Sequence, residues 1–473
     1  MRTELAILGA GPGGHAAAFR AADLGMEVTL IDPEPRLGGT CLLRGCIPSK
    51  TLLHAARVVA EVEELVGFGV CHEPPLLDPA ALRRRKEEVV DALAGGLRQL
   101  ASRRKIRVVR AWAEFADSRT LRLRPGPGST LEDAELGFER AIIATGSVPA
   151  SPPFPRRPTE GMMFSDAALD LPEIPERLLV IGGGYIGLEL ATVYAALGSR
   201  VCIVEMTDGL LPGVDRNLVR PLAKAAQKRF ESVLLGTRVI ELERGAEGIR
   251  VVFEQDGKES ITEYDAILVA VGRRSHTAGL GLENTHVGVN RRGFIEVDAA
   301  WRTADERILA IGDVAGEPML AHKATHEGKA AVEILAGEKP AERFPAVPAV
   351  VFTDPEIAWV GLTEEAARAE GKRVAAAQFP WAACGRAQAV GRAEGLTKWI
   401  VDPETDRLLG CGIVGPGAGD LIGEAVLAIH AGLTAADVAG VIHPHPTLSE
   451  TLGFAAEVHL GIATDVYRPK RRT

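Results

Sequence analysis

Several features that would assign this chain quickly to a class of protein are missing from its sequence. Aromatic residues make up 5% of its 473 positions, and six residues are cysteines. No stretch of 18 uncharged apolar residues occurs, so a membrane span is not indicated. The net charge of −9 offers no electrostatic reason to bind nucleic acid. We therefore expect neither a membrane nor a nucleic acid among its partners.

Basic residues cluster in three short runs, at 82–86, 102–105 and the chain end, without interleaved aromatic residues. Solvated helix faces or a tail explain such runs better than a nucleic-acid interface. The opening residues, MRTELAILGAGPGG, read as a β-strand leading into glycines rather than as a signal peptide. We therefore expect a cytoplasmic protein, a compartment in which structural disulfides are rare.

Glycine, in contrast, is abundant, with 52 residues in a chain that is 46% hydrophobic. Glycines in so apolar a chain favour tight turns and close approach of the backbone to ligands over disorder. The length exceeds what one hydrophobic core accommodates, so three or four domains are expected.

The most informative feature is an internal repeat. Segment 6–32, AILGAGPGGHAAAFRAADLGMEVTLID, returns at 179–205 as LVIGGGYIGLELATVYAALGSRVCIVE. Each copy predicts a strand, a G-x-G-x-x-G turn, a helix and a second strand that ends in an acidic residue. The copies align without a gap, so that Gly9, Gly11, Gly14, Gly25, Val28 and Asp32 correspond to Gly182, Gly184, Gly187, Gly198, Val201 and Glu205.

This pattern is typical of dinucleotide binding. The first glycine permits the tight turn, the second lets the backbone approach a pyrophosphate, and the third lets the helix pack on the strand. The free N–H groups of the helix then face the phosphates, and the acid accepts hydrogen bonds from a ribose diol. Two complete copies predict two bound dinucleotides. The segment MTDG directly after Glu205 contains no arginine, and the Glu205 carboxylate would repel a 2′-phosphate, so the second site is predicted to prefer NAD over NADP.

Further segments complete the plan of the chain. Apolar strands that end in glycine, within 139–147, 265–274 and 308–316, are predicted to close the nucleotide domains. The proline-rich segment 147–158 reads as a linker. Beyond residue 345, short strands and two helical patterns predict a final α+β domain. Its apolar helix around 422–429 fits a core and a dimer face equally well.

Cys41 and Cys46 stand close together in GGTCLLRGCIPSK, whereas the other cysteines are scattered. A zinc site would need a second ligand pair at suitable spacing, which the sequence lacks, so no metal is predicted. A structural disulfide would close a loop too short to stabilise much through chain entropy. A redox pair fits best, and the dinucleotide of the first copy should exchange electrons with it.

The geometry of a disulfide adds a local prediction. Its Cα atoms must lie within about 7 Å, whereas five residues of ideal helix rise about 7.5 Å. We therefore expect the segment to depart from a regular helix, for which Gly45 and Pro48 are suited. Lys50 follows Cys46 by four residues, on the same helical face, where its charge would stabilise a Cys46 thiolate.

Near the end of the chain, HPHPTLSE places His445 between two prolines and five residues before Glu450. A carboxylate that orients an imidazole makes a general base near neutral pH. His443 competes for this role but is farther from Glu450 in sequence. A purely structural loop histidine is the alternative reading.

In order, the chain contains GAGPGG, GGTC, GCIPSK, ATGS, GGGYIGLE, VGRR, AIGDVAG, MLAHKA, FTDPEIAWVG and HPHPTLSE. Over essentially its whole length it thereby resembles the disulfide-dependent FAD/NAD flavoprotein reductases, and HPHPTLSE is characteristic of their lipoamide-oxidising branch. The resemblance implies an α/β fold with two Rossmann-like dinucleotide-binding domains plus a C-terminal α+β dimerisation domain. It implies an FAD domain at 1–148 and 276–345, an NAD domain at 149–275 and a dimerisation domain at 346–473.

The resemblance also implies a set of site residues, with Lys50 beside the flavin and paired with Glu189. FAD would be bound by Gly9, Gly11, Gly14, Asp32, Lys50, Ala113, Thr145, Gly146, Asp313 and Ala321. NAD would be bound by Gly182, Gly183, Gly184, Gly187, Glu205, Val239 and Gly272.

The implied activity is the oxidation of dihydrolipoamide by a homodimer. Its partner would be the lipoyl domain of a 2-oxoacid dehydrogenase, a glycine cleavage system or another lipoate-binding protein. His445 and Glu450 of one subunit would serve the Cys41–Cys46 disulfide of the other, and electrons would pass through FAD to NAD. Leu43, where the family usually has asparagine, and the charged Arg44 depart from the pattern. The alternatives are another NAD(P)H-dependent disulfide reductase and a mainly structural subunit that binds a lipoyl complex.

Overall fold

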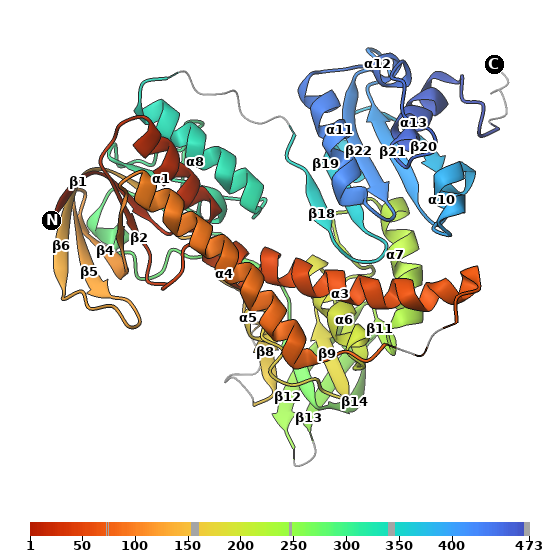
Figure 1. The fold of residues 1–473 in the computed structure, drawn as a ribbon, viewed down its shortest axis with the longest axis horizontal. Helices are drawn as coiled ribbons and strands as arrows, with labels where there is room; N and C mark the ends of the chain where they lie inside the picture. Colours follow the sequence, from red (N-terminus) through yellow and green to blue (C-terminus); the bar gives the residue numbers. More distant parts are fainter. Residues whose placement is uncertain (72, 74, 153–159, 246–247, 339–345, 468–473) are drawn as a thin grey trace.

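The computed structural model describes residues 1–71, 73, 75–152, 160–245, 248–338 and 346–467. Much of the predicted linker at 147–158 and the terminal basic run at 468–473 lie outside these residues. Figure 1 shows two α/β units and a C-terminal domain, with two long helices running across them.

The first copy of the repeat forms the centre of a parallel sheet. The strand order is β3-β2-β1-β6 with β17 also beside β6, and all these neighbours pair in parallel. Strands β5 and β4 continue from β6 as an antiparallel meander. The elements are β1 (Arg2–Leu8), α1 (Pro12–Asp23), β2 (Val28–Ile31), β3 (Arg107–Val109), β4 (Ala111–Asp117), β5 (Thr120–Pro125), β6 (Ala134–Ile143), β17 (Ile308–Ala310) and α8 (Ala321–Leu335).

The second copy repeats this topology. Strands β11-β10-β9-β15 correspond in order and direction to β3-β2-β1-β6, and β8 adds a further parallel strand beside β15. Strands β12 to β14 form a separate antiparallel sheet. The elements are β8 (Met162–Phe164), α5 (Ser165–Leu169), β9 (Arg177–Ile181), α6 (Tyr185–Ala196), β10 (Arg200–Val204), α7 (Arg216–Arg229), β11 (Ser232–Leu234), β12 (Thr237–Arg244), β13 (Ile249–Gln255), β14 (Lys258–Tyr264) and β15 (Ala266–Val269).

The chain crosses between the two nucleotide units twice, and the two crossings lie side by side. Strand β7 (Ser147–Pro149) leaves the first unit, and β16 (Arg273–Ser275) leaves the second. The two strands pair with each other in antiparallel fashion. This short ladder fixes the junction between the units.

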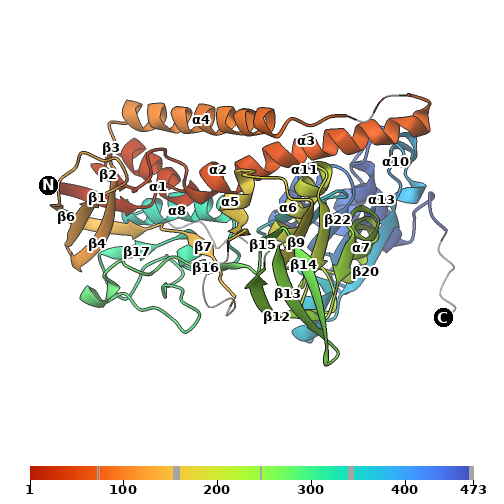
Figure 2. The same cartoon turned by 90° about the horizontal axis from the view of Figure 1, so that it is seen from below.

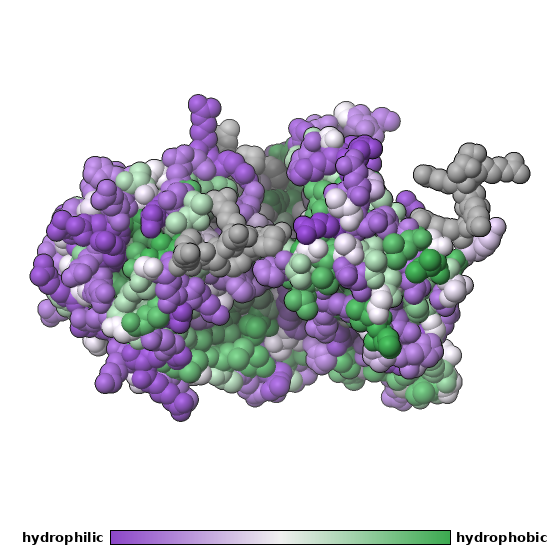
Figure 3. Space-filling model, turned by 90° about the horizontal axis from the view of Figure 1, so that it is seen from above, coloured by the Kyte–Doolittle hydropathy of each residue, from purple (hydrophilic) through white to green (hydrophobic). Residues whose placement is uncertain are grey.

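The predicted α+β domain at the end of the chain is confirmed. Its five strands have the order β18-β19-β22-β21-β20, and the buried Trp381 and Trp399 belong to its hydrophobic core. In α11, Ile422 faces the core whereas Leu427 is 66% exposed, so this helix serves both core and surface. Figure 3 shows apolar surface on this part of the molecule. Ile442 in this domain is also 97% exposed. The elements are β18 (Ala349–Val351), β19 (Ile357–Gly361), α9 (Glu364–Ala369), β20 (Ala375–Pro380), α10 (Gly385–Ala389), β21 (Leu396–Val401), β22 (Leu408–Val414), α11 (Ala418–His430), α12 (Ala435–Ala439) and α13 (Glu450–Leu460).

Two long helices, α3 (Cys46–Glu64) and α4 (Pro79–Arg103), run along one side of the molecule, and the short α2 (Gly39–Arg44) precedes them (Figure 2). The solvated helix face predicted for 82–86 is wrong at one position. Arg84 and Arg85 are exposed, but Lys86 is 3% exposed because it is enclosed between α4 and the second unit. Within the described ranges, no helix has the length and apolarity that a membrane crossing needs.

Candidate active site

A cavity of about 580 Å3 lies between the two nucleotide units. This volume is typical of small-molecule and cofactor sites. Residues from widely separated motifs meet in its wall. Of the residues predicted to bind FAD, it is lined by Gly9, Gly11, Asp32, Lys50, Ala113, Thr145, Gly146, Asp313 and Ala321, together with Cys41, Cys46 and Glu189.

The glycine-rich turn at the start of α1 forms one end of this cavity. Gly9 has φ +101°, and a Cβ on it would lie 2.4 Å from the Ala144 carbonyl oxygen. A Cβ on Gly14 would lie 1.8 Å from the Gly9 carbonyl oxygen, so Gly14 packs the helix against the turn and does not line the cavity. No side chain caps the N-terminus of α1 at Gly11. The first N–H groups of the helix therefore suit a phosphate.

Asp32 directly follows β2 and lies beside this turn. Its Oδ2 accepts a hydrogen bond from the Ala10 N–H at 2.7 Å, and its Oδ1 accepts one from the Glu34 N–H at 2.9 Å. Burial raises the pKa of the Asp32 carboxyl, and these two N–H groups oppose that rise. The carboxylate is thus held in place at the cavity wall, as recognition of a ribose diol requires.

The second unit repeats these relationships at the predicted NAD site. Glu205 Oε2 accepts from the Gly183 N–H at 2.7 Å, and a Cβ on Gly187 would lie 2.1 Å from the Gly182 carbonyl oxygen. No side chain caps α6 at Gly184. Gly272 has φ +122°. The Val239 side chain in β12 is buried in a hydrophobic cluster with Val251 and Phe253 of β13. None of the residues predicted to bind NAD lines the 580 Å3 cavity.

The cysteine segment departs from a regular helix, as predicted. Cys41 lies in α2 and Cys46 is the first residue of α3, with Gly45 between them at φ −145° and ψ −111°. A Cβ on Gly45 would lie 2.9 Å from the Thr40 carbonyl oxygen, so this close approach requires glycine. The break brings the two sulfur atoms together, whereas Pro48 lies inside the first turn of α3.

Cys41 and Cys46 are free thiols in the structure and are hydrogen-bonded to each other. This hydrogen bond, followed by the charge of Lys50, lowers the pKa of Cys46 to about 7, although burial and Glu189 oppose the change. The same hydrogen bond and burial raise the pKa of Cys41. In the reduced pair, Cys46 therefore loses its proton before Cys41 does.

Lys50 is fixed by two neighbours from other parts of the chain. Its Nζ lies 2.8 Å from Glu189 Oε2 in α6 and 4.5 Å from the ring centroid of Phe352. The other carboxylate oxygen of Glu189 accepts from the Phe352 N–H at 3.0 Å. One cation thus connects the cysteine helix, the second unit and the start of the C-terminal domain.

The histidine pair predicted near the chain end is formed, but outside the cavity. His445 Nδ1 lies 2.9 Å from Glu450 Oε1, and Glu450 Oε2 accepts from the Thr447 N–H at 2.7 Å. The His445 side chain is 77% exposed and does not line the cysteine cavity. The competing His443 pairs instead with Glu424 at 2.8 Å. One chain therefore does not bring His445 and the cysteines together.

Sequence reasoning did not single out three further residues of the cavity wall. Arg273 Nε donates to Ser147 Oγ at 2.8 Å, and Ser147 Oγ donates to Asp313 Oδ2 at 2.6 Å. Tyr185, at the start of α6, also lines the cavity. All three residues lie inside motifs noted in the sequence, namely VGRR, ATGS and GGGYIGLE. Membership in these motifs is the sequence signal that could have identified them. Arg44 forms an ion pair with Glu34 in the same wall.

Comparison with known proteins agrees with this geometry. Residues 3–328 match the pyridine nucleotide-disulphide oxidoreductase family, and residues 347–456 match the dimerisation domain of that family. The chain belongs to the pyridine nucleotide-disulphide oxidoreductases. Family members use FAD and NAD(H), and the α/β fold with two nucleotide-binding units and a dimerisation domain is theirs.

Several relatives of this oxidoreductase carry the same name. It is 43% identical to a dihydrolipoyl dehydrogenase of Vibrio cholerae, over 100% of this chain and 98% of the relative. It is 45% identical to a dihydrolipoyl dehydrogenase of Thermus scotoductus, over 96% of each chain. Among solved structures it is similar to the Cu(II) complex of the HOCl-induced flavoprotein disulfide reductase RclA from Escherichia coli. That match has a TM-score of 0.85 and 30% identity, over 97% of this chain and 99% of the other.

Proposed function

We propose that this oxidoreductase is a dihydrolipoyl dehydrogenase, which oxidises protein-bound dihydrolipoamide to lipoamide and reduces NAD+. The observation that carries the proposal is the pair of half-sites. One is the Cys41–Cys46 pair at the cavity wall, and the other is an exposed His445 oriented by a buried Glu450. A homodimer would unite them, with His445 of the partner subunit facing the cysteines.

The residues present suit the two cofactors of the family. Asp32, the α1 N-terminus, Thr145, Gly146 and Asp313 would hold FAD in the cavity. Glu205 and the uncapped α6 N-terminus, with no arginine directly after Glu205, would hold NAD in the second unit. When bound, FAD supplies the two-electron relay between the cysteine pair and NAD+.

The chain's own residues account for the sulfur chemistry. His445 of the partner subunit removes the proton from one dihydrolipoyl thiol, and Glu450 stabilises the resulting imidazolium. The lipoyl thiolate attacks Cys41 of the oxidised pair, so the Cys41–Cys46 bond breaks and a mixed disulfide forms. Cys46 leaves as a thiolate, which its lowered pKa favours. The second lipoyl thiol then attacks the mixed disulfide, which releases lipoyl disulfide and leaves the proton on Cys41.

Domain limits and compartment are part of the same proposal. We infer an FAD domain at 1–148 and 276–345, an NAD domain at 149–275 and a dimerisation domain at 346–473. The paired crossings β7 and β16 support the limits near 148 and 275. We place the protein in the cytoplasm, where a close cysteine pair is more often catalytic than structural. The partner is a lipoyl domain.

The decisive experiment mixes the FAD-loaded protein with dihydrolipoamide and NAD+ and follows NADH formation. We expect rapid turnover with NAD+, far slower turnover with NADP+, and none in Cys46→Ser protein that retains FAD. Absence of turnover from protein shown to contain FAD would refute the lipoamide assignment. Reduction of glutathione disulfide by NADPH at a higher rate would favour the alternative disulfide reductase.

A further inference from the structure

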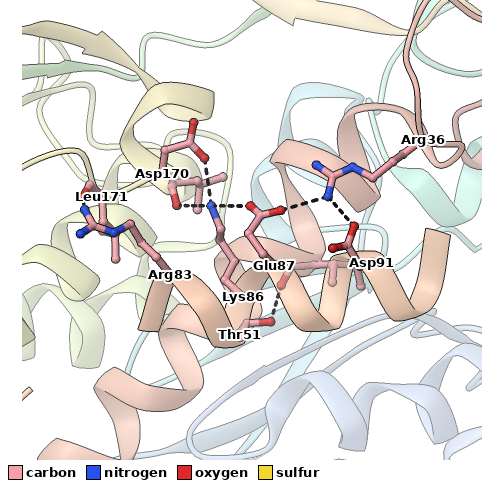
Figure 4. Close-up of polar contacts among 10 residues, drawn as sticks. Arg36, Thr51, Arg83, Lys86, Glu87, Asp91, Asp170 and Leu171 are labelled. Atoms are coloured by element: carbon pink, nitrogen blue, oxygen red, sulfur yellow. Dashed lines mark hydrogen bonds and ion pairs between the residues drawn. The ribbon is translucent and has the colours of Figure 1, made fainter. Parts of the chain in front are cut away.

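The network around Lys86 takes no part in the sulfur chemistry, yet it buries a lysine. Lys86 Nζ donates to the Leu169 carbonyl oxygen at 3.0 Å and to Asp170 Oδ1 at 2.9 Å (Figure 4). Its side chain is 3% exposed. A lysine side chain is almost never buried to this extent unless its charge is paired with acceptor groups. The acceptors lie in the second nucleotide unit, whereas Lys86 belongs to α4, which leads into the first.

These contacts cap the C-terminal end of α5. The last carbonyl groups of a helix have no partner within the helix, and cations stabilise them. Lys86 donates to the Leu169 carbonyl, and Tyr194 donates to the Ala168 carbonyl at 2.9 Å. Just beyond the helix, Arg83 donates to the Leu171 carbonyl at 2.5 Å. Two of these three contacts therefore come from α4 rather than from the unit that contains α5.

Helix α4 is anchored to the first unit by the residue next to Lys86. Glu87 Oε1 lies 3.1 Å from Lys86 Nζ, and its Oε2 accepts from Arg36 NH1 at 2.9 Å. Arg36 also donates to Asp91 Oδ1 at 2.9 Å. Arg36 lies on the loop between Asp32 and the cysteine helix α2. Figure 4 shows this row of side chains, which runs from that loop through α4 to the end of α5.

The capped helix forms part of the active-site wall. Ser165, Asp166 and Leu169 of α5 line the 580 Å3 cavity together with Tyr185 and Ile186 at the start of α6. Leu169 is also buried in one hydrophobic cluster with Leu188 and Leu190 of α6. A shift of α5 would therefore displace the start of α6, next to the glycine-rich turn of the second unit. Leu52 and Leu53 of α3 belong to the same cluster, whereas Cys41 and Cys46 do not.

We propose that Lys86 is a positioning residue that sets the NAD unit against the FAD unit, and so governs electron transfer between the two nucleotides. The inference requires that the two units bind FAD and NAD but does not require lipoamide as the substrate. Removal of the Lys86 cation should impair the nicotinamide step more than the thiol step, because the partners that Lys86 loses in the second unit, Leu169 and Asp170, lie at the end of α5 and not at the cysteines.

The test compares Lys86→Met with Arg85→Met in the FAD-loaded dimer. Arg85 is the adjacent basic residue on α4, is 69% exposed, and contacts Glu88 on the same helix. Reduction of the bound flavin by NADH is followed by rapid mixing, and reduction by dihydrolipoamide is followed separately. We expect Lys86→Met to slow the NADH reaction about tenfold, as for a small misplacement of reacting groups, with the dihydrolipoamide reaction within about twofold of wild type.

Hydrogen–deuterium exchange gives a readout independent of turnover. Amides of residues 165–171 should exchange faster in Lys86→Met than in Arg85→Met. Equal NADH rates in the two variants, an equal loss in both half-reactions, or unchanged exchange would overturn the proposal. Should Lys86→Met fail to fold, Asp170→Ala replaces it, since that side chain is 73% exposed and Lys86 keeps its carbonyl partner. A smaller loss, confined to the NADH reaction, is then expected, and an unaltered NADH rate overturns the proposal.

Discussion

Lys50 donates to Glu189 across 2.8 Å, and this ion pair joins the cysteine helix α3 to α6 in the second unit. Glu189 is 4% exposed, whereas Lys50 is 32% exposed and lines the cavity beside Cys46. The pair balances two opposite effects on Cys46, because the lysine lowers the pKa of that thiol and the glutamate raises it.

Substitutions of Lys50 and of Glu189 should therefore shift the pKa of Cys46 in opposite directions. In the reduced protein Cys46 is a thiol below its pKa of about 7 and a thiolate above it. Lys50→Met should move the midpoint to higher pH, and Glu189→Gln should move it to lower pH. The measurement is the ultraviolet thiolate absorbance that reduced wild type has and Cys46→Ser lacks. Shifts of the same sign in both variants would contradict this balance.

His445 should act on the cysteines of the other subunit. His445→Gln alone should lower dihydrolipoamide turnover by about 10²–10⁴-fold, the usual contribution of a general base. Reduction of the flavin by NADH should be unchanged in this variant, because no thiol of the substrate is involved.

Mixed dimers distinguish a site shared between two subunits from a site formed within one chain. A dimer of one Cys41→Ser chain and one His445→Gln chain contains one intact site only if Cys41 and His445 come from different subunits. We expect the purified heterodimer to recover about half of the wild-type activity, although each parent homodimer is inactive. An inactive heterodimer would show that each chain uses its own histidine.

Glu205 should determine the preference for NAD. Glu205→Ala removes a charged acceptor, a loss of about 1.5–3 kcal/mol, so the KM for NAD+ should rise at least about tenfold. The preference for NAD+ over NADP+ should decrease, because the carboxylate that repels a 2′-phosphate is gone. Asp208→Ala, at an exposed acid on the same loop, is the matched control and should leave both constants unchanged.

Lys398 should matter for stability rather than for chemistry. It is 1% exposed in β21 and pairs with Asp215, which is 7% exposed at the start of α7. Lys398→Met would leave a buried carboxylate unpaired, which costs about 3–5 kcal/mol. The thermal unfolding midpoint should fall by several degrees, and adding Asp215→Asn should recover part of the loss. An unchanged midpoint in Lys398→Met would show that Asp215 is solvated.

Much of the fold could be predicted because it depends on local pattern. The repeat at 6–32 and 179–205 predicted two strand–turn–helix–strand units, since glycine spacing and apolar strands are readable residue by residue. The break between Cys41 and Cys46 was also predictable, because the reach of a disulfide is fixed by covalent geometry. The pairing of His445 with Glu450 followed from their closeness in the chain.

Other relationships were decided by tertiary structure alone. Lys86 sits in a run of basic residues that looks solvated, and only the placement of α5 beside α4 buries it. Ser147 and Arg273 meet because the two crossings between the units pair as β7 and β16. His445 lies away from the cysteines of its own chain, although both belong to the proposed site.

The sequence by itself determined which residues are candidates for the proposed chemistry, because nucleophile, base and phosphate-binding glycines are specified by residue type and short spacing. Tertiary structure decided how these groups are held and charged, because burial and partners distant in the chain set the hydrogen bonds of Asp32, the thiolate at Cys46 and the position of Lys50. Those quantities depend on contacts between elements that no local pattern encodes.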